Sequence, residues 1–164
     1  MANTNAPYGF RLWRRGTGGS GTIPLGGVTI PSAGTFKVGD PVKVSAGLGY
    51  LAAGTNATYG IANRVVPGWG EAATTQKSLE IIPCDDATYF RAQSIGTTNA
   101  TIAFVGVASK KYRIAGTTSG YTGIDLTHTT AGVLQILELA PGSAFGTYAE
   151  FIVMFARGAY FGAA

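Results

Sequence analysis

Residues 133–157, VLQILELAPGSAFGTYAEFIVMFAR, decide the fold class that we predict for this chain. The run 133–140 is crowded with Val, Ile and Leu, which favours a strand over a helix, and Pro141-Gly142 ends it. In the run 147–157, apolar side chains occupy both alternating faces, which indicates a long central strand. This stretch therefore predicts two strands separated by a turn.

Short apolar runs of the same kind fill the rest of the chain and alternate with glycine-rich turns. One run, 101–109, has apolar side chains on both faces and is predicted to be a strand buried on two sides. Residues 67–77 contain a Pro-Gly-Trp-Gly loop and are predicted to be a surface excursion. The other predicted strands lie in residues 36–44, 48–53, 59–66, 78–83, 87–92, 110–115 and 121–126, and residues 23–35 are expected to be extended. About nine or ten short strands with frequent turn signals predict an all-β sandwich or barrel.

The composition fits one β domain with few charges. Hydrophobic residues make up 46% of the chain, charged residues 12%, and 25 residues are glycine. The net charge of +4 is unevenly placed, because residues 1–36 carry three arginines and no acid, whereas residues 37–164 carry nine basic and eight acidic groups. A nearly neutral body of this kind is not an electrostatic binder of nucleic acid.

The single cysteine, Cys84, excludes an internal disulfide framework. The chain starts with polar residues and no apolar signal-peptide core comes after them, so we expect synthesis in the cytoplasm without export. Its longest apolar stretches, such as 102–108 and 151–156, are far shorter than a membrane span. The sequence therefore predicts no membrane partner.

The first 22 residues, MANTNAPYGFRLWRRGTGGSGT, differ from the rest of the chain. They hold four large apolar side chains and three arginines, and a glycine-rich joint at 16–21 comes directly after these. We expect that such a segment cannot bury its own aromatic residues and is flexibly tied to the rest of the chain. The predicted organisation is an extended arm and joint over residues 1–22 and a single β domain over residues 23–164.

The arm has two distinct faces if it is extended. Tyr8, Phe10 and Leu12 then share one face, and Arg11 and Trp13 take the other. We predict that the arm docks on a partner through Asn5, Pro7, Tyr8, Phe10, Arg11, Leu12, Trp13, Arg14 and Arg15. Two alternatives stay open: the arm folds back on its own domain as an edge strand, or it contacts nucleic acid through its arginines and aromatic rings.

No combination of residues points to catalysis or to a metal site. His128 is the only histidine and lies between threonines, which is typical of a surface residue. Cys84 precedes Asp85 and Asp86, whose charges oppose formation of a thiolate, and we expect these carboxylates to cap backbone amides in a turn. The joint at 16–21 lacks the Lys-Ser/Thr end of a phosphate-binding loop. We therefore predict a protein that is not an enzyme and that uses no cofactor or metal.

Several segments, taken in order, resemble head structural proteins of tailed bacteriophages. The heptad Asn5-Ala6-Pro7-Tyr8-Gly9-Phe10-Arg11 resembles the N-A-P-x-G-F-R start of that family. The segment Val38-Gly39-Asp40-Pro41-Val42-Lys43-Val44 resembles a turn that leads into a strand in the same family. The further similar segments are the glycine turn at 47–51, Tyr59-Gly60-Ile61-Ala62, the strand at 134–139 with its Pro-Gly turn, and the apolar strand at 150–155.

This resemblance implies a capsid decoration protein, also called a cement protein, on the outer surface of the virion. Such proteins bridge neighbouring major capsid subunits and stabilise the shell. The implied partners are the major capsid protein and further copies of this chain, as a homotrimer or homodimer. The implied fold is a β-barrel, either jelly-roll-like or the smaller β-tulip, and the number of predicted strands favours the jelly-roll form.

Two other classes of function stay open. A head–tail connector or tail-tube protein is also a minor component of the virion, and the tube proteins form rings. A carbohydrate-binding β-sandwich would present exposed aromatic residues on one face. The candidates for such a face are Trp69, Tyr112, Tyr121 and Tyr148.

Overall fold

The structure is a computed structural model that describes residues 3–16, 26–31, 36–66, 76–85, 87–116 and 120–156. Within these residues the regular structure is almost entirely strand. The strands are β1 (Arg11–Arg15), β2 (Gly26–Pro31), β3 (Pro41–Ser45), β4 (Leu48–Leu51), β5 (Gly60–Val66), β6 (Gln76–Pro83), β7 (Thr88–Ile95), β8 (Arg113–Gly116), β9 (Thr122–Asp125), β10 (Leu134–Leu139) and β11 (Glu150–Phe155), and one 3-10 helix is η1 (Ile102–Phe104). The predicted all-β class is confirmed.

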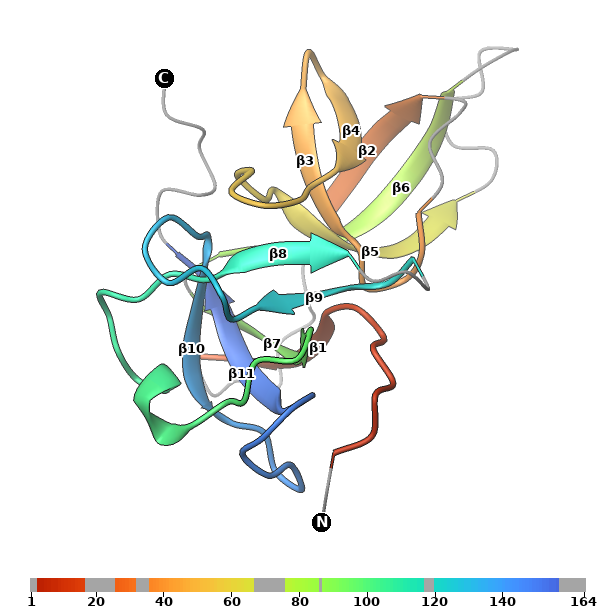
Figure 1. The fold of residues 1–164 in the computed structure, drawn as a ribbon. Helices are drawn as coiled ribbons and strands as arrows, with labels where there is room; N and C mark the ends of the chain where they lie inside the picture. The colour runs from red at the N-terminus through yellow and green to blue at the C-terminus, as the bar shows by residue number, and fades with distance from the viewer. Residues whose placement is uncertain are drawn as a thin grey trace.

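The strands form two sheets, which Figure 1 shows one above the other. The small sheet has the order β2-β6-β5-β3-β4. The large sheet has the order β10-β11-β7-β9-β8, and β1 pairs with β7 as an additional strand. Strands β2 to β6 therefore form one sheet, and β7 to β11 form the other together with β1. The choice between a jelly roll and a β-tulip stays a prediction.

The small sheet curls so that its two edge strands approach each other. Gly49 of β4 lies so close to β2 that an added Cβ would be 2.7 Å from Cγ1 of Val28. The interior of the curl is filled by Val28, Ile30, Val42, Ala62, Leu79 and Ile81. The small sheet is strongly curved but open, because β2 and β4 are its two edges and do not pair.

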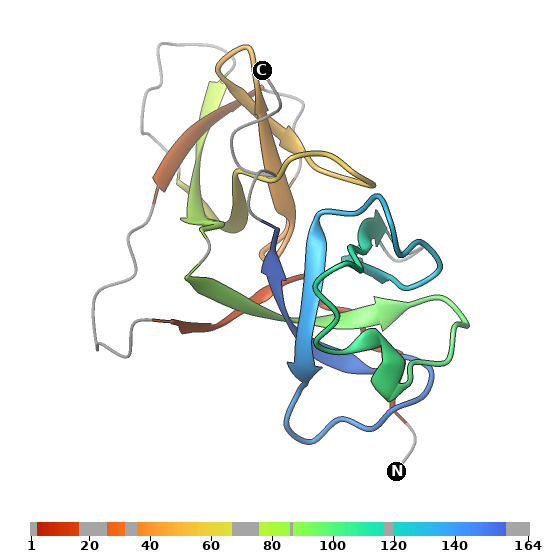
Figure 2. The same cartoon turned by 90° about the vertical axis from the view of Figure 1, so that its left-hand side faces the viewer.

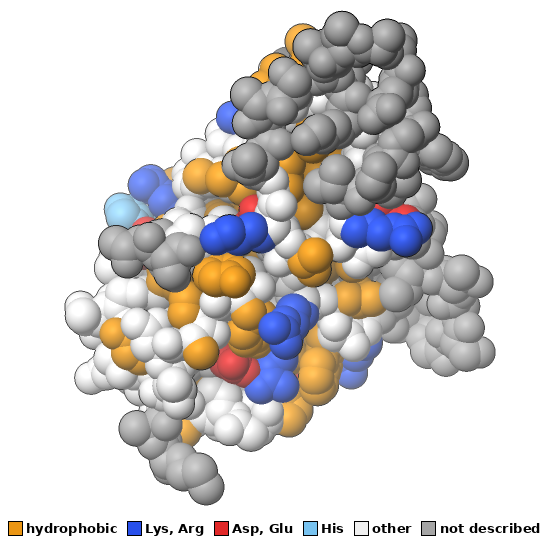
Figure 3. All heavy atoms as spheres, turned by 90° about the vertical axis from the view of Figure 1, so that its right-hand side faces the viewer, with side chains coloured by type: hydrophobic (Ala, Val, Ile, Leu, Met, Phe, Trp, Pro, Cys, Tyr) orange, Lys and Arg blue, Asp and Glu red, His pale blue; other side chains and the backbone are white. Residues whose placement is uncertain are grey.

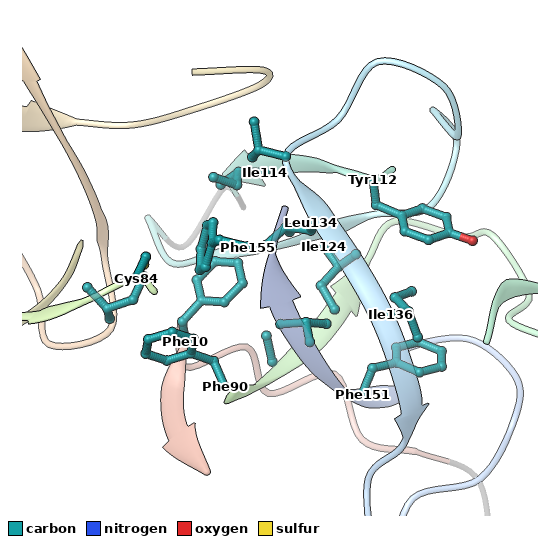
Figure 4. Close-up of a cluster of buried hydrophobic side chains, with 14 of the residues drawn as sticks. Phe10, Cys84, Phe90, Tyr112, Ile114, Ile124, Leu134, Ile136, Phe151 and Phe155 are labelled. Atoms are coloured by element: carbon teal, nitrogen blue, oxygen red, sulfur yellow. The ribbon is translucent and has the colours of Figure 1, made fainter. Parts of the chain in front are cut away.

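A second core lies on the inner side of the large sheet and reaches the small sheet at one end (Figure 4). The rings of Phe10 and Phe155 have centroids 5.5 Å apart, and those of Phe90 and Phe155 have centroids 5.7 Å apart in an edge-on arrangement. Ile61 and Ile82 of the small sheet belong to the same cluster of buried side chains. The two sheets are therefore held together by apolar packing.

The stretch 133–157 folds as predicted over its described part. β10 and β11 pair in antiparallel fashion, with Ile136 opposite Val153. β11 is an interior strand, because β7 pairs with its other edge. Phe151 and Phe155 are fully buried.

The prediction of a doubly buried strand over residues 101–109 is wrong. The segment contains η1, and Ile102 is 70% exposed. Gly106 has a φ of +69°, which interrupts any extended run. Phe104 and Val105 of this segment pack against the core, and the other apolar side chains do not. A loop of this kind has the same alternation of apolar residues as a buried strand, so the pattern does not distinguish them.

The N-terminal segment lies on its own domain, so the alternative of an edge strand is confirmed for the described residues. β1 pairs in antiparallel fashion with β7, with Arg11 opposite Arg91 (Figure 2). Upstream, Gln93 of β7 donates from Nε2 to the carbonyl of Thr4 at 2.8 Å and accepts the N–H of Ala6 at 3.1 Å. Extended backbone leaves N–H and C=O groups free, and the sheet satisfies them here.

The expectation that this segment cannot bury its own aromatic residues is wrong for Phe10, which is 1% exposed. Its ring belongs to the same cluster of buried side chains as Ile61, Phe90 and Phe155. The separation into an arm over 1–22 and a domain over 23–164 is therefore corrected for residues 3–16, which belong to the domain. Residues 17–22 lie outside the described residues.

Two glycines let the segment cross the small sheet on its way into the core. Gly9 has a φ of +82° and Gly39 a φ of +95°, and the N–H of Phe10 donates to the carbonyl of Gly39 at 2.9 Å. A Cβ on Gly9 would lie 2.8 Å from the Gly39 oxygen, and one on Gly39 would lie 2.9 Å from the Tyr8 oxygen. Only glycine permits this approach of the two backbones.

Asp40 lies beside this crossing and joins the two sheets. It is 4% exposed and accepts the backbone N–H of Lys37 at 2.8 Å, while Oγ1 of Thr122 on β9 lies 3.5 Å from its other oxygen. Burial raises the pKa of the Asp40 carboxyl above its ordinary value, and the hydrogen bond from Lys37 partly offsets that effect.

The raised pKa of Asp40 predicts how stability changes with pH. Since the folded chain holds this proton more tightly than the unfolded chain, protonation of Asp40 favours folding. The contribution is fully present below the ordinary pKa and is lost as pH rises through the raised one. We expect Asp40→Asn, which resembles the protonated form, to gain stability relative to the wild type between acid and neutral pH. Urea unfolding of both proteins across this range measures the difference, and a constant difference would contradict the prediction.

Among the described residues, no helix is long and apolar enough to cross a membrane.

Candidate binding surface

Arginine and aromatic side chains gather on the outer face of β1 and β7. Figure 3 shows basic side chains interspersed with apolar ones on the side of the molecule that carries the N-terminal segment. In β7, Tyr89 and Arg91 alternate with buried neighbours, so their side chains point away from the core. We define the arginine–aromatic surface as Tyr8, Arg11, Trp13, Arg14, Tyr89 and Arg91.

Each guanidinium of this surface lies over an aromatic ring. Arg11 lies 4.1 Å from the ring centroid of Tyr8, Arg14 lies 5.3 Å from that of Tyr89, and Arg91 lies 6.0 Å from that of Trp13. Such cation–π contacts restrict the positions of the guanidinium groups. The surface is thus ordered before any partner binds.

Only one of these arginines is strongly paired within the described part of the chain. Nε of Arg91 donates to Oε2 of Glu150 on β11 at 2.6 Å, and both side chains are partly buried. Arg14 lies 3.9 Å from Glu138, with both side chains more than half exposed. Arg11 has no ion-pair partner among the residues that the structure describes.

Two shallow depressions flank the Arg91–Glu150 pair. One, of about 510 Å³, is bounded by the first residues of the N-terminal segment, by Gln93 and by the turn at 142–144. The other, of about 400 Å³, is lined by Tyr8, Arg11, Leu12 and Trp13 in addition to the pair. Both are open hollows rather than enclosed cavities.

The hydroxyl of Tyr8 is buried at the edge of the second depression. It makes no hydrogen bond of acceptable geometry with the described residues, although Arg91 is close enough to interact with its charge. Burial raises the pKa of Tyr8 to about 12, and the charge of Glu150 adds to this effect. Tyr8 is therefore neutral at physiological pH.

The predicted contact residues divide into a buried and an exposed group. Phe10 is removed from the partner-binding set, because it fills the core of its own chain. Leu12 is partly buried against the same core, and Pro7 and Tyr8 are partly buried. Exposed residues are Asn5, Arg11, Trp13 at 39% and Arg14. The side chain of Arg15 lies outside the described part.

Tyr89, Arg91, Glu138 and Glu150 belong to this surface and were not predicted from the sequence. Their positions depend on the pairing of β1 with β7 and of β7 with β11, which joins segments far apart in the chain. The only signal was the alternation of Tyr89 and Arg91 with apolar residues, which predicts an exposed face without saying what covers it.

The residues considered for chemistry are held in structural roles. Cys84 is fully buried, and burial, together with the charge of Asp85, raises the pKa of its thiol. Asp85 accepts the N–H of Ala87 at 3.1 Å, which confirms its predicted turn-capping role, and Asp86 lies outside the described residues. No group of three or more potential metal ligands occurs among the described residues.

His128 lies on an exposed turn and pairs with a carboxylate. Its Nδ1 is 2.8 Å from Oδ2 of Asp125 and 2.9 Å from the Thr127 hydroxyl, which also bonds Asp125. A catalytic relay needs the orienting acid and the nucleophile on different ring nitrogens, whereas both partners here face Nδ1. Although burial opposes it, these hydrogen bonds lower the pKa of Asp125, as expected of a turn carboxylate.

The aromatic residues considered for a carbohydrate platform do not form one face. Tyr112 is fully buried, and its hydroxyl donates to the carbonyl of Phe104 at 3.0 Å. Tyr121 is 36% exposed and lies under Lys37, on a different part of the molecule from β1. Trp69 lies outside the described residues.

Comparisons of the chain with protein-family models, with curated proteins and with solved structures find no match.

Proposed function

We propose that this protein is a virion structural protein of a tailed bacteriophage, a decoration protein that binds the outer surface of the head. In this role it bridges neighbouring major capsid subunits and stabilises the shell without chemistry. The proposal rests on the resemblance of its sequence segments to phage head proteins.

One observation carries the proposal furthest: the two most distinctive segments of the resemblance form a single structural unit. Gly9 of the heptad 5–11 crosses Gly39 of the segment 38–44, and Phe10 bonds that turn before entering the core. The two segments that carry the resemblance therefore act together in the packing of this chain.

The character of the surface supports an assembly role. The arginine–aromatic surface contains Trp, Tyr and Arg, the residue types that dominate the energy of protein interfaces. Large apolar side chains are exposed elsewhere as well, including Val44, Leu51 and Tyr59 near the β3–β4 hairpin. Weak contacts of this kind become strong when one assembly grips several subunits at once.

Cryo-electron microscopy of virions of the phage that encodes this chain tests the proposal. We expect density for the two sheets on the outer shell, between neighbouring capsid subunits. Density in a ring at the portal or along the tail would replace the decoration role by that of a connector or tube protein. Absence of the chain from the particle would overturn the virion assignment itself.

The test should not rely on deleting residues 1–15. Such a deletion removes Phe10 and β1 from the domain, so loss of binding would not distinguish lost contacts from unfolding. Substitutions at exposed positions of β1 leave the core intact and are the better tool.

A further inference from the structure

We propose that the arginine–aromatic surface binds an acidic segment of a partner protein, with Arg11 and Arg14 pairing with its carboxylates and Trp13 packing between them. This inference rests on the proposed function only for the identity of that partner, which would then be a capsid subunit. The pairing of arginines with carboxylates depends only on the arginine–aromatic surface.

The position of β1 makes its outer face accessible. β7 is paired along one edge with β11, and along the other edge with β1 and then β9. Among the described strands, β1 pairs only with β7, so it is an edge strand of the large sheet. A segment lying against β1 meets Arg11, Trp13 and Arg14 without displacing a described strand.

One arginine on this face is held in a close ion pair, and two are available to a partner. Arg91 is committed to Glu150 by a close, partly buried ion pair. Arg11 has no carboxylate partner among the described residues, and the contact of Arg14 with Glu138 is long and exposed. Ion pairs of that exposed kind contribute little, so Arg14 can exchange Glu138 for a partner's carboxylate at small cost.

The two available arginines are already oriented. Tyr8 holds the guanidinium of Arg11, and Tyr89 that of Arg14. Because a planar guanidinium offers parallel N–H groups that match a carboxylate, an arginine fixed in this way loses less freedom on binding. Trp13 lies between them in sequence at the bulge of β1 and supplies apolar area to a bound segment.

The balance of charge favours a protein carboxylate over a nucleic acid. A phosphate backbone requires a run of cations, and only two arginines are available on the described part of this face. Glu138 and Glu150 border the same face and would repel a polyanion. A partner with a few carboxylates among apolar residues matches both features.

A fluorescein-labelled synthetic peptide that carries two Glu residues among Val and Ser residues is the probe, and fluorescence anisotropy with the full-length protein is the readout. We expect saturable binding that weakens as salt rises. The double variant Arg11→Gln/Arg14→Gln is expected to bind about tenfold more weakly. The matched control, Arg64→Gln/Lys111→Gln, removes the same charge elsewhere on the exposed surface and is expected to bind like the wild type.

Three outcomes would overturn the inference. They are equal weakening by both double variants, absence of peptide binding by the wild type, and binding of labelled oligothymidylate in place of the peptide. Circular dichroism of each variant shows that it is folded. Because this assay contains no virion, its failure leaves the location of the chain in the particle to be decided separately by microscopy.

Discussion

The variant Phe10→Ala is expected to lose about 3–5 kcal/mol of unfolding free energy relative to the wild type. Phe10 lies between the two sheets at 1% exposure, with its ring against Phe155. Removal of the ring leaves a cavity whose walls, formed by strands of both sheets, cannot collapse without moving a sheet. Urea denaturation of the full-length chain measures the loss.

Trp13→Ala is the matched control for this experiment. It also removes an aromatic ring from β1, but from a side chain that is 39% exposed. We expect it to cost less than about 1 kcal/mol. Similar losses for the two variants, or no loss for Phe10→Ala, would contradict the placement of Phe10 in the core of its own chain.

The second large effect is expected at the backbone crossing. Gly39→Ala would place a Cβ 2.9 Å from the Tyr8 oxygen and 3.0 Å from the Phe10 nitrogen. Both are backbone atoms and cannot turn aside, so the N-terminal segment must shift as a whole. We expect faster cleavage by trypsin after Arg11 and Arg14, because a displaced β1 exposes these bonds.

Gly47→Ala separates the crossing from the general effect of a left-handed backbone. Gly47 has a φ of +78° in the β3–β4 turn, and an added Cβ would meet no atom within 4 Å. Its substitution is expected to cost about 1–2 kcal/mol from backbone conformation alone. Gly39→Ala should cost about 1–3 kcal/mol more, by comparison with overpacked sites. Equal urea midpoints for the two variants would show that the segment does not cross here.

The variants of Phe10 and Gly39 also test which side chains are available to a partner. If Phe10 and β1 are held in the domain, the arginine–aromatic surface is fixed before binding, and the affinity for a partner depends on Arg11, Trp13 and Arg14. If they are not held, the segment is free to dock elsewhere with Phe10 as an anchor. The stability of these variants therefore decides which side chains a partner meets.

Local patterns were sufficient for most of the strands. The runs at 59–66, 78–83 and 133–140 each contain a strand, because alternating side chains and flanking Gly or Pro act within a few residues. The prediction of a strand at 101–109 was wrong because it also used only local signals. The apolar residues of this run are a local signal, whereas the lack of a neighbouring strand to pair with is a property of the whole fold.

The binding surface was only half predictable. Arg11, Trp13 and Arg14 stand out in the sequence as basic and aromatic residues in a segment without acids. Their companions Arg91 and Glu150 come from β7 and β11, and no local feature links them to the N-terminus. Strand pairing joined them, and it also turned Phe10 inward.

By itself, the sequence determined the all-β class and the pair of strands within 133–157, since these depend on side-chain period and turn chemistry. Tertiary structure alone decided that the N-terminal segment belongs to the domain. The sequence predicted that Phe10 docks on a partner, whereas in the structure it is buried in its own chain. Phe10 is buried there because its ring packs with the other side chains of the core, and because the glycine at position 39 allows the two backbones to pass.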